Sequence, residues 1–442
     1  MYMNIRGKLT ALMMLLGFTG LSNSNVVHAT DTLKVGLNDL FEIAEAHNTD
    51  LSILKINQSI SQLSIKETKN QLLPTIDATL AVSYNSDGRI TDRNFKNGFT
   101  VDIPSFGNNF ALEAKQLIYG GGAVNRAIEF TQLQQDQSVI STEVARQNIR
   151  FGIAGYYLEM KKISNQQIVI EKNITQTEKM ITQIKAKTSQ GVALKNNITR
   201  YELQLESLKV TLLQLKNAYR IMNNELVRLL DLSTGTILNL TEMSSENTVD
   251  ALDSWNNQAM EHAPGLKLSN NDILLSEKAI DLVKAEKRPQ VFAFAQNYFN
   301  GPIMIEIPVI DKNFNYFQVG VGVKYSISNL YKTDTKIKKA QLGLEMARAT
   351  DYKVKKQLLN DIEAAQIKYQ ETKDIYHTRL KNIELAQQNY EVVKHRYLND
   401  LSLITEMLDA ENTKVDAELQ AANAQINIIF HYYQLKKLSG TL

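Results

Sequence analysis

The feature that most constrains this chain is an internal repeat that spans nearly half its length. Each copy is a helix-period segment that stops at a proline, Pro74 or Pro289, and runs into β-branched and aromatic residues. A period of this size is typical of a duplicated domain half rather than of a short solenoid repeat. We therefore expect two copies of one helix–strand–helix unit, residues 30–235 and 236–442. The residues that recur at one common offset of 215 are Ala44/Ala259, His47/His262, Leu51/Leu266, Ser61/Ser276, Ile65/Ile280, Lys69/Lys284 and Pro74/Pro289.

The first residues have the order of a secretory signal. Arg6 and Lys8 precede the apolar run 11–21, and the small-residue pattern that follows ends at Ala29. This order predicts a signal peptide over residues 1–29, removed after Ala29. The alternative is a membrane anchor, but the apolar run is shorter than the ~20 residues that a spanning helix needs. With no cysteine in the chain, disulfides, thiolate metal sites and an N-terminal lipid anchor are excluded.

Two strands are expected in each repeat, over 76–84 and up to 116–119 in the first, and over 291–299 and 317–328 in the second. The last of these alternates apolar residues with polar or small ones. A transmembrane barrel strand, apolar toward lipid and polar toward the lumen, has this pattern. A soluble two-sheet sandwich has the same alternation, so both interpretations stay open. The residues expected to face lipid are Phe317, Val319, Val321, Val323, Tyr325 and Ile327.

Long helices fill the rest of the chain. We expect helices over 38–71 and 124–190, and over about 334–398, with returning helices after breaks at Gly191 and at Asn399-Asp400. The first returning helix carries an apolar seam with steps of 3 and 4, typical of an antiparallel coiled-coil hairpin. Residues 231–257, which include Trp255, are expected to pack outside this coil. The seam residues are Ile198, Tyr201, Leu205, Leu208, Leu212, Leu215, Tyr219, Met222, Leu226 and Leu229.

This plan requires partner chains. Four strands cannot close a barrel, since single-chain barrels have about eight strands or more, and an open sheet edge is not tolerated in lipid. A helix of ~65 residues is ~100 Å long, so hairpins of that reach have little local core. We therefore expect several copies of the chain to assemble. The net charge of +2 gives no global field that would draw the chain to nucleic acid.

In its signal peptide, duplication and motif order, the sequence resembles the TolC family of outer-membrane efflux proteins over essentially the whole mature chain. The motifs are Leu73-Pro74 before a strand, Gln116-Leu117-Ile118-Tyr119-Gly120-Gly121, Gly191 at a turn, and Tyr397 followed by Glu406-Met407-Leu408-Asp409-Ala410. The resemblance implies a mostly α fold with transmembrane β strands, which closes as a homotrimer with a 12-stranded β-barrel and an α-helical tunnel across the periplasm. It implies an exit duct of a tripartite efflux or type I secretion system, in contact with outer-membrane lipid, a periplasmic adaptor and an inner-membrane transporter.

The resemblance also implies functional positions. The adaptor is expected at the two turns, which are Gly191 and Val192, and Asn399, Asp400 and Leu401. Glu406 and Asp409, three residues apart on one helix face, are expected to form a ring of carboxylates at the periplasmic end of the tunnel, although an ordinary solvated helix face has the same spacing. The positions of a known charged latch are Ser402 and Asn197 here, so we expect closure through helix packing and uncharged hydrogen bonds.

No pattern of catalysis or of cofactor or metal binding is found. Gly120-Gly121-Gly122 precedes a helix, but no GK[ST] follows, so a strand-to-helix corner is expected there. The histidines have no metal-ligand spacing. Two alternatives remain to the channel. One is a soluble periplasmic coiled-coil adaptor or scaffold protein, and the other is an enzyme on a helical scaffold, for which the sequence has no motif.

Overall fold

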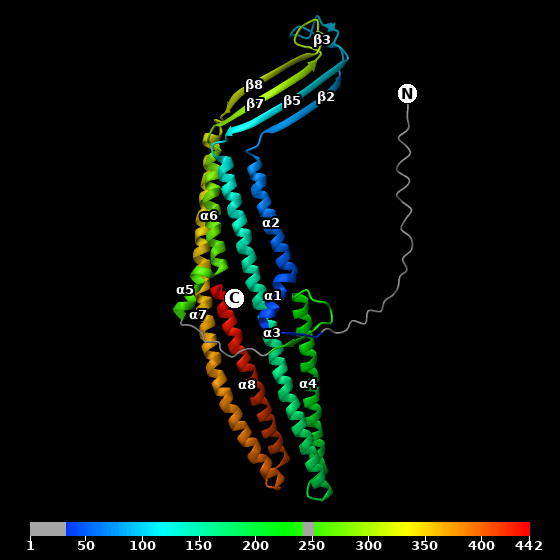
Figure 1. The fold of residues 1–442 in the computed structure, drawn as a ribbon, viewed down its shortest axis with the longest axis vertical. Helices are drawn as coiled ribbons and strands as arrows, with labels where there is room; N and C mark the ends of the chain where they lie inside the picture. The colour runs from blue at the N-terminus through cyan, green and yellow to red at the C-terminus, as the bar shows by residue number, and fades with distance from the viewer. Residues whose placement is uncertain (1–31, 242–251) are drawn as a thin grey trace, which may run out of the picture.

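The computed structural model describes residues 32–241 and 252–442, so the expected signal peptide lies outside the described residues. A sheet caps one end of a long helical body, and two helical hairpins form the other end (Figure 1). The first half of the chain contributes β1 (Thr32–Val35), α1 (Leu37–His47), α2 (Thr49–Asn70), β2 (Thr75–Tyr84), β3 (Gly88–Ile90), β4 (Phe99–Val101), β5 (Phe106–Tyr119), α3 (Ala123–Ser189), α4 (Lys195–Leu229) and β6 (Ile237–Leu240). The second half contributes α5 (Leu252–His262), α6 (Pro264–Ala285), β7 (Gln290–Gly301), β8 (Phe314–Lys324), α7 (Asn329–Leu398) and α8 (Ile404–Ser439).

The capping sheet has the strand order β2-β5-β7-β8, and every neighbouring pair is antiparallel. Its register separates two faces, because alternate residues of a strand point to opposite sides. One row across all four strands is Ile76, Ala114, Ala295 and Val319, and the adjacent row of the other face is Asp77, Glu113, Gln296 and Gln318. One face is therefore mainly apolar and the other mainly polar. Strands β2 and β8 are the two open edges.

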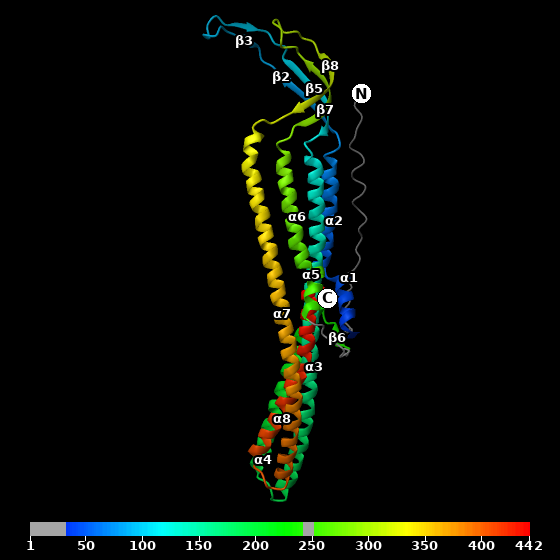
Figure 2. The same ribbon diagram turned by 90° about the vertical axis from the view of Figure 1, so that its left-hand side faces the viewer.

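Below the sheet, four helices continue the same order. Helix α2 contacts α3, α3 contacts α6, and α6 contacts α7, so α2 and α7 lie at the edges, as β2 and β8 do (Figure 2). Farther from the sheet, α3 pairs with α4 and α7 pairs with α8, and α3 also contacts α8. At ~1.5 Å per residue, the 67 residues of α3 extend ~100 Å.

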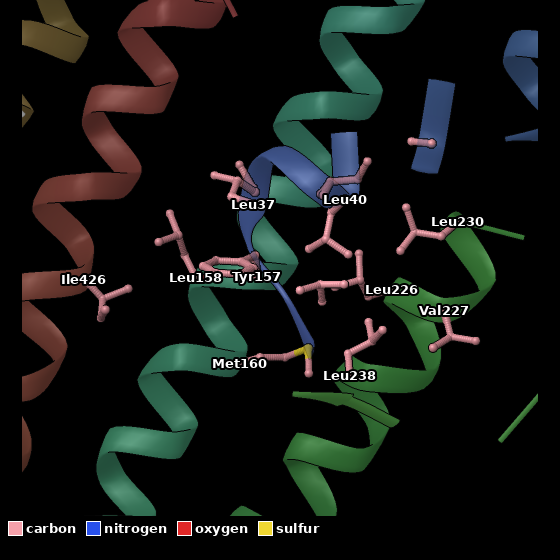
Figure 3. Close-up of a cluster of buried hydrophobic side chains, with 14 residues drawn as sticks. Leu37, Leu40, Tyr157, Leu158, Met160, Leu226, Val227, Leu230, Leu238 and Ile426 are labelled. Atoms are coloured by element: carbon pink, nitrogen blue, oxygen red, sulfur yellow. The ribbon is translucent and has the colours of Figure 1, made fainter. Parts of the chain in front are cut away.

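The largest core lies where the short N-terminal elements pack against this body (Figure 3). Leu40 of α1, Tyr157 of α3, Leu226 of α4 and Leu238 of β6 are all fully buried there. Strands β1 and β6 pair in parallel beside this core, and the Asn223 side chain accepts a hydrogen bond from the Leu238 amide and donates one to the Thr236 carbonyl. Elements from both ends of the first half thus converge at mid-length.

The expected seam on the first returning helix is confirmed. Its members lie in three successive core clusters along α4, from Ile198 near the turn to Leu229 near the mid-length core. Trp255 lies on α5 and is buried against α7 and α8, with its ring edge-on to Tyr432. Residues 242–251 of the segment around it lie outside the described residues.

Several element boundaries differ from those expected. The helix expected over 38–71 breaks at Asn48, whose side chain accepts a hydrogen bond from the Leu51 amide and so starts a second helix. Between the two strands expected in the first repeat, the short β3 pairs with β4 in an additional hairpin. Strand β8 ends at Lys324, so Tyr325 and Ile327 lie in the connection to α7 rather than in the strand.

The glycine run forms the expected corner between β5 and α3. Gly121 has a φ of +67°, and a Cβ there would lie 2.6 Å from Cβ of Arg288. Arg288 donates a 3.2 Å hydrogen bond to the Gly121 carbonyl, so the corner packs on the end of α6 in the other half of the chain. No helix among the described residues is long and apolar enough to cross a membrane.

Candidate tunnel gate and docking tips

The two helical turns at the end of the body have the same backbone geometry. Gly191 has a φ of +78° and Asp400 a φ of +62°, which is the left-handed region. The residue after each closes the turn, since the Val192 amide donates to the Lys187 carbonyl at 3.0 Å and the Leu401 amide to the Arg396 carbonyl at 2.8 Å. These are Schellman-type helix ends, and aspartate adopts the left-handed conformation more readily than most residues.

Each turn presents apolar side chains to solvent. Val192 and Leu194 are exposed after the first turn, and Leu401, with 69% of its surface exposed, and Leu403 after the second. Both turns thus have an apolar residue directly after the left-handed position and another two residues later. Apolar groups on the tips of helical hairpins are suited to a partner that covers them.

An ion pair joins the two turns within one chain. Nζ of Lys187 on α3 lies 2.9 Å from Oδ1 of Asp400 and also contacts the Leu398 carbonyl. The expectation that closure uses only uncharged contacts is therefore wrong for the contacts inside one chain. Asn197 does make an uncharged contact, a 3.3 Å hydrogen bond from its amide to the Tyr397 hydroxyl.

Glu406 and Asp409 lie in the first turns of α8 and are both exposed. Met407 and Ala410, the residues directly after them, are fully buried. The Glu406 carboxylate accepts hydrogen bonds from the Leu403 amide, at 3.3 Å, and from the Ser402 hydroxyl, and these bonds lower its pKa below the usual value. Glu406 therefore caps the start of α8, whereas Asp409 has no ion pair with any described residue.

A buried polar cluster, which we had not expected, lies between the two hairpins farther along α8. Glu411 is 2% exposed and Lys414 1% exposed, although both side chains are ionisable. Glu411 accepts a 2.7 Å hydrogen bond from the Thr177 hydroxyl, and Nζ of Lys414 donates to Oε1 of Gln176 at 2.7 Å. Nζ of Lys414 also lies 4.6 Å from the centre of the Tyr390 ring, a cation–π distance.

Burial dominates the electrostatics of this cluster. It raises the pKa of Glu411, which the Thr177 hydrogen bond and the Lys414 charge only partly offset. Burial also lowers the pKa of Lys414, and the charge of Glu418 partly offsets this effect. The pKa of Tyr390 rises to about 12, again mainly through burial. The charged forms of Glu411 and Lys414 are thus both disfavoured inside the seam.

Polar contacts continue along the α3–α8 seam away from the tips. The Asn173 amide donates to Glu418 at 3.1 Å, and the Gln166 amide donates to Asn423 at 2.7 Å. Apolar residues also join the hairpins, since Val415 of α8 packs with Ile170 of α3 and Leu208 of α4. The two hairpins are therefore held together by both polar and apolar contacts. The signal in the sequence is the pair Glu411 and Lys414, two ionisable residues within the apolar stepping of the last helix.

At the other end, four of the six residues expected to face lipid lie on the apolar side of the sheet. Phe317, Val319, Val321 and Val323 belong to β8 and are exposed, with Val319 at 75%. Leu80 of β2 is 80% exposed on the same face. A protein in water rarely exposes a continuous apolar sheet face of this kind.

Comparison with known proteins gives matches to outer-membrane channels. Residues 40–231 match the family model described as outer membrane efflux protein. The fold is similar to that of the outer membrane protein VceC from Vibrio cholerae, with 14% identity, a TM-score of 0.76 and coverage of 91% of this chain and 96% of that one. It is also similar to CusC, with 12% identity, a TM-score of 0.78 and coverage of 91% and 92%. The open state of the MtrE outer membrane channel of Neisseria gonorrhoeae matches with 16% identity, a TM-score of 0.72 and coverage of 91% and 88%. No curated protein in the comparison matches the sequence.

Proposed function

We propose that three copies of this chain close into an exit duct from the periplasm to the cell exterior. The duct is a passive conduit with no catalytic step, and its periplasmic end docks on an adaptor and an inner-membrane pump. The family match and the similarity of fold to outer-membrane channels support this proposal. The arrangement of the sheet, with two unlike faces and two open edges, is the observation that carries it.

The open edges of sheet and helix layer coincide. At one edge of the sheet, α2 leads into β2, and at the other edge, β8 leads into α7. Since all neighbouring strands are antiparallel, β2 and β8 run in opposite directions, and β8 of one copy beside β2 of the next continues the alternation. The edge helices also expose apolar side chains, namely Ile53, Ile56, Ile60 and Leu63 on α2, and Leu342 and Met346 on α7.

Because such an interface joins two different edges, it generates a closed ring when the rotations between successive copies add up to a full turn. Closure places the apolar face of the sheet outward against lipid and its polar face toward a lumen, as in transmembrane barrels. It also removes the unpaired strand edges, which lipid does not tolerate. The alternative of a soluble periplasmic adaptor or scaffold leaves Leu80 and Val319 in water and gives the sheet edges no partner.

Cysteine crosslinking tests the ring directly, because the natural chain has no cysteine. Cysteines at successive positions of β2, each combined with Val319→Cys on β8, should yield covalent trimers as the largest species in outer-membrane fractions. Each single-cysteine variant alone should give no covalent trimer and serves as a control. A soluble monomer in the periplasm, or covalent species of more than three chains, would contradict the proposal.

A further inference from the structure

The apolar face of the sheet ends in tyrosines on the side next to the helices. Tyr119 at the end of β5 pairs with Val291 of the apolar face, and Tyr325 follows Val321 and Val323 at the same two-residue spacing. Both are about half exposed, and Tyr331 in the first turn of α7 is exposed too. Tyrosines at this position are typical of the boundary between hydrocarbon and water in membrane proteins.

Lysines that form no ion pair with a described residue lie just beyond these tyrosines. Near the helix ends, Lys287 pairs with Asp334, and Lys336 pairs with Glu286, each at 2.6 to 2.7 Å. Six other lysines have no ion pair with any described residue, and we call them the lysine collar. They are Lys66 and Lys69 of α2, Lys284 of α6, and Lys332, Lys338 and Lys339 of α7.

The excess of positive charge is local. Residues 329–340 at the start of α7 contain four lysines and a single acid, Asp334, whereas the whole chain has a net charge of only +2. Glu67 and Asp281 lie on the same helix ends and are outnumbered by the collar. A surface of this kind favours an anionic partner, and its position next to the tyrosines indicates which one.

We propose that the lysine collar binds the headgroups of anionic phospholipids in the periplasmic leaflet of the outer membrane. The proposal rests on the exit duct proposed above, which places the apolar face in lipid. At ~1.5 Å per residue, Lys332 lies ~5 Å and Lys339 ~15 Å beyond the start of α7. The headgroup layer is about 5–8 Å deep on each side, and long lysine side chains extend toward it while their stems pack on the protein.

Lipid retention by the purified trimer tests this surface. The trimer in mixed micelles of phosphatidylglycerol and phosphatidylcholine is washed, and the retained lipids are counted by native mass spectrometry. The test variant is K332Q/K338Q/K339Q. The matched control is K353Q/K355Q/K356Q, which removes the same charge from exposed positions on the same helix, on average about 27 Å farther from the sheet.

Wild type and control should retain phosphatidylglycerol alike, and the collar variant should retain ~5-fold less or lower, in line with the attraction of basic residues to anionic membrane surfaces. Inorganic phosphate should not displace the lipid more than chloride does at equal ionic strength. Equal retention by all three proteins, equal losses in both variants, or displacement by phosphate would overturn the proposal. The proposal would also be overturned if the collar variant lost binding to purified peptidoglycan but retained as much lipid as wild type.

If the collar variant still forms outer-membrane trimers, a negative result concerns the collar alone, whereas a chain absent from the membrane contradicts the exit duct itself.

Discussion

Nζ of Lys187 lies 2.9 Å from Oδ1 of Asp400, and this ion pair joins the ends of two helical hairpins that are 213 residues apart in sequence. Asp400 also holds the left-handed position of its turn, with a φ of +62°. One side chain therefore shapes the second turn and ties it to α3. Relative movement of the two hairpins at the tips has to break this contact.

Asp400→Asn should loosen the tips without disturbing the turn, because asparagine also tolerates the left-handed conformation. The pair is partly exposed, so its loss should cost about 0.2–1 kcal/mol and raise the resting conductance of the reconstituted channel modestly. Salt screens the same contact, so wild-type conductance should rise with salt beyond bulk scaling. The variant should lose this extra dependence, and Lys209→Gln, which removes a lysine paired within α4, is the control. If conductance depends on salt in the same way in wild type and Asp400→Asn, the ion pair does not control the opening of the channel.

Glu411 predicts a pH dependence of stability. Its pKa in the folded chain is raised by burial, so the folded state takes up a proton at a pH where the unfolded chain is still ionised. Stability from this group is complete below the unfolded pKa and is lost as the pH rises through the folded pKa. Compared with Glu411→Gln, wild type should therefore gain stability as the pH falls from 8 toward 5. Thermal unfolding of both proteins across this range measures the difference, and parallel curves would show that Glu411 is not desolvated.

The sequence predicts those features whose pattern lies within one helix or strand, and it does not predict contacts between distant segments. The coiled-coil seam and the β8 alternation follow from side-chain periodicity, which one element contains by itself, and the structure has both. The pairing of β1 with β6 depends on contacts between segments about 200 residues apart, to which Asn223 contributes by bonding the β6 backbone. The Lys187–Asp400 pair and the Glu411–Thr177 bond likewise need the relative placement of two hairpins, which periodicity within one helix does not contain.

Charge on the apolar face of the sheet should block assembly. Val321 is exposed and pairs with Ala293 on this face, whereas Gln318 pairs with Gln296 on the polar face. Val321→Arg should destabilise the inserted state by about 2–4 kcal/mol if it lies near the bilayer midplane, and Gln318→Arg should be tolerated because the proposed duct places this residue toward the lumen. The yield of heat-modifiable trimer in outer-membrane fractions measures both. Normal assembly of Val321→Arg would mean that this face does not contact lipid.

Glu406 and Asp409 should act differently on ion passage. Three copies would bring six carboxylates together at the narrow end of the tunnel, and such a ring attracts cations. The Glu406 carboxylate is already held by the Leu403 amide and the Ser402 hydroxyl, whereas Asp409 has no ion pair with a described residue. Asp409→Asn should therefore weaken cation selectivity and block by multivalent cations at least as strongly as Glu406→Gln, and the double variant most strongly. Bilayer recordings decide this, and unchanged selectivity in the double variant would assign both residues to an ordinary solvated face.

The two turns should be the docking surface for the adaptor. Gly191→Pro is incompatible with the φ of +78° at that position, so it should disrupt the first tip, and Val192→Asp and Leu401→Asp should remove the exposed apolar contacts. Each change should abolish export while trimers still reach the outer membrane. Lys195→Gln, at the start of α4 beside the first tip, is a control that keeps both turns and their apolar residues. Photo-crosslinkers at Val192 and Leu401 should capture the adaptor in cells, whereas one at Asn300, near the far end of the sheet, should not. Adducts confined to Asn300, or normal export by all three tip variants, would place the adaptor elsewhere.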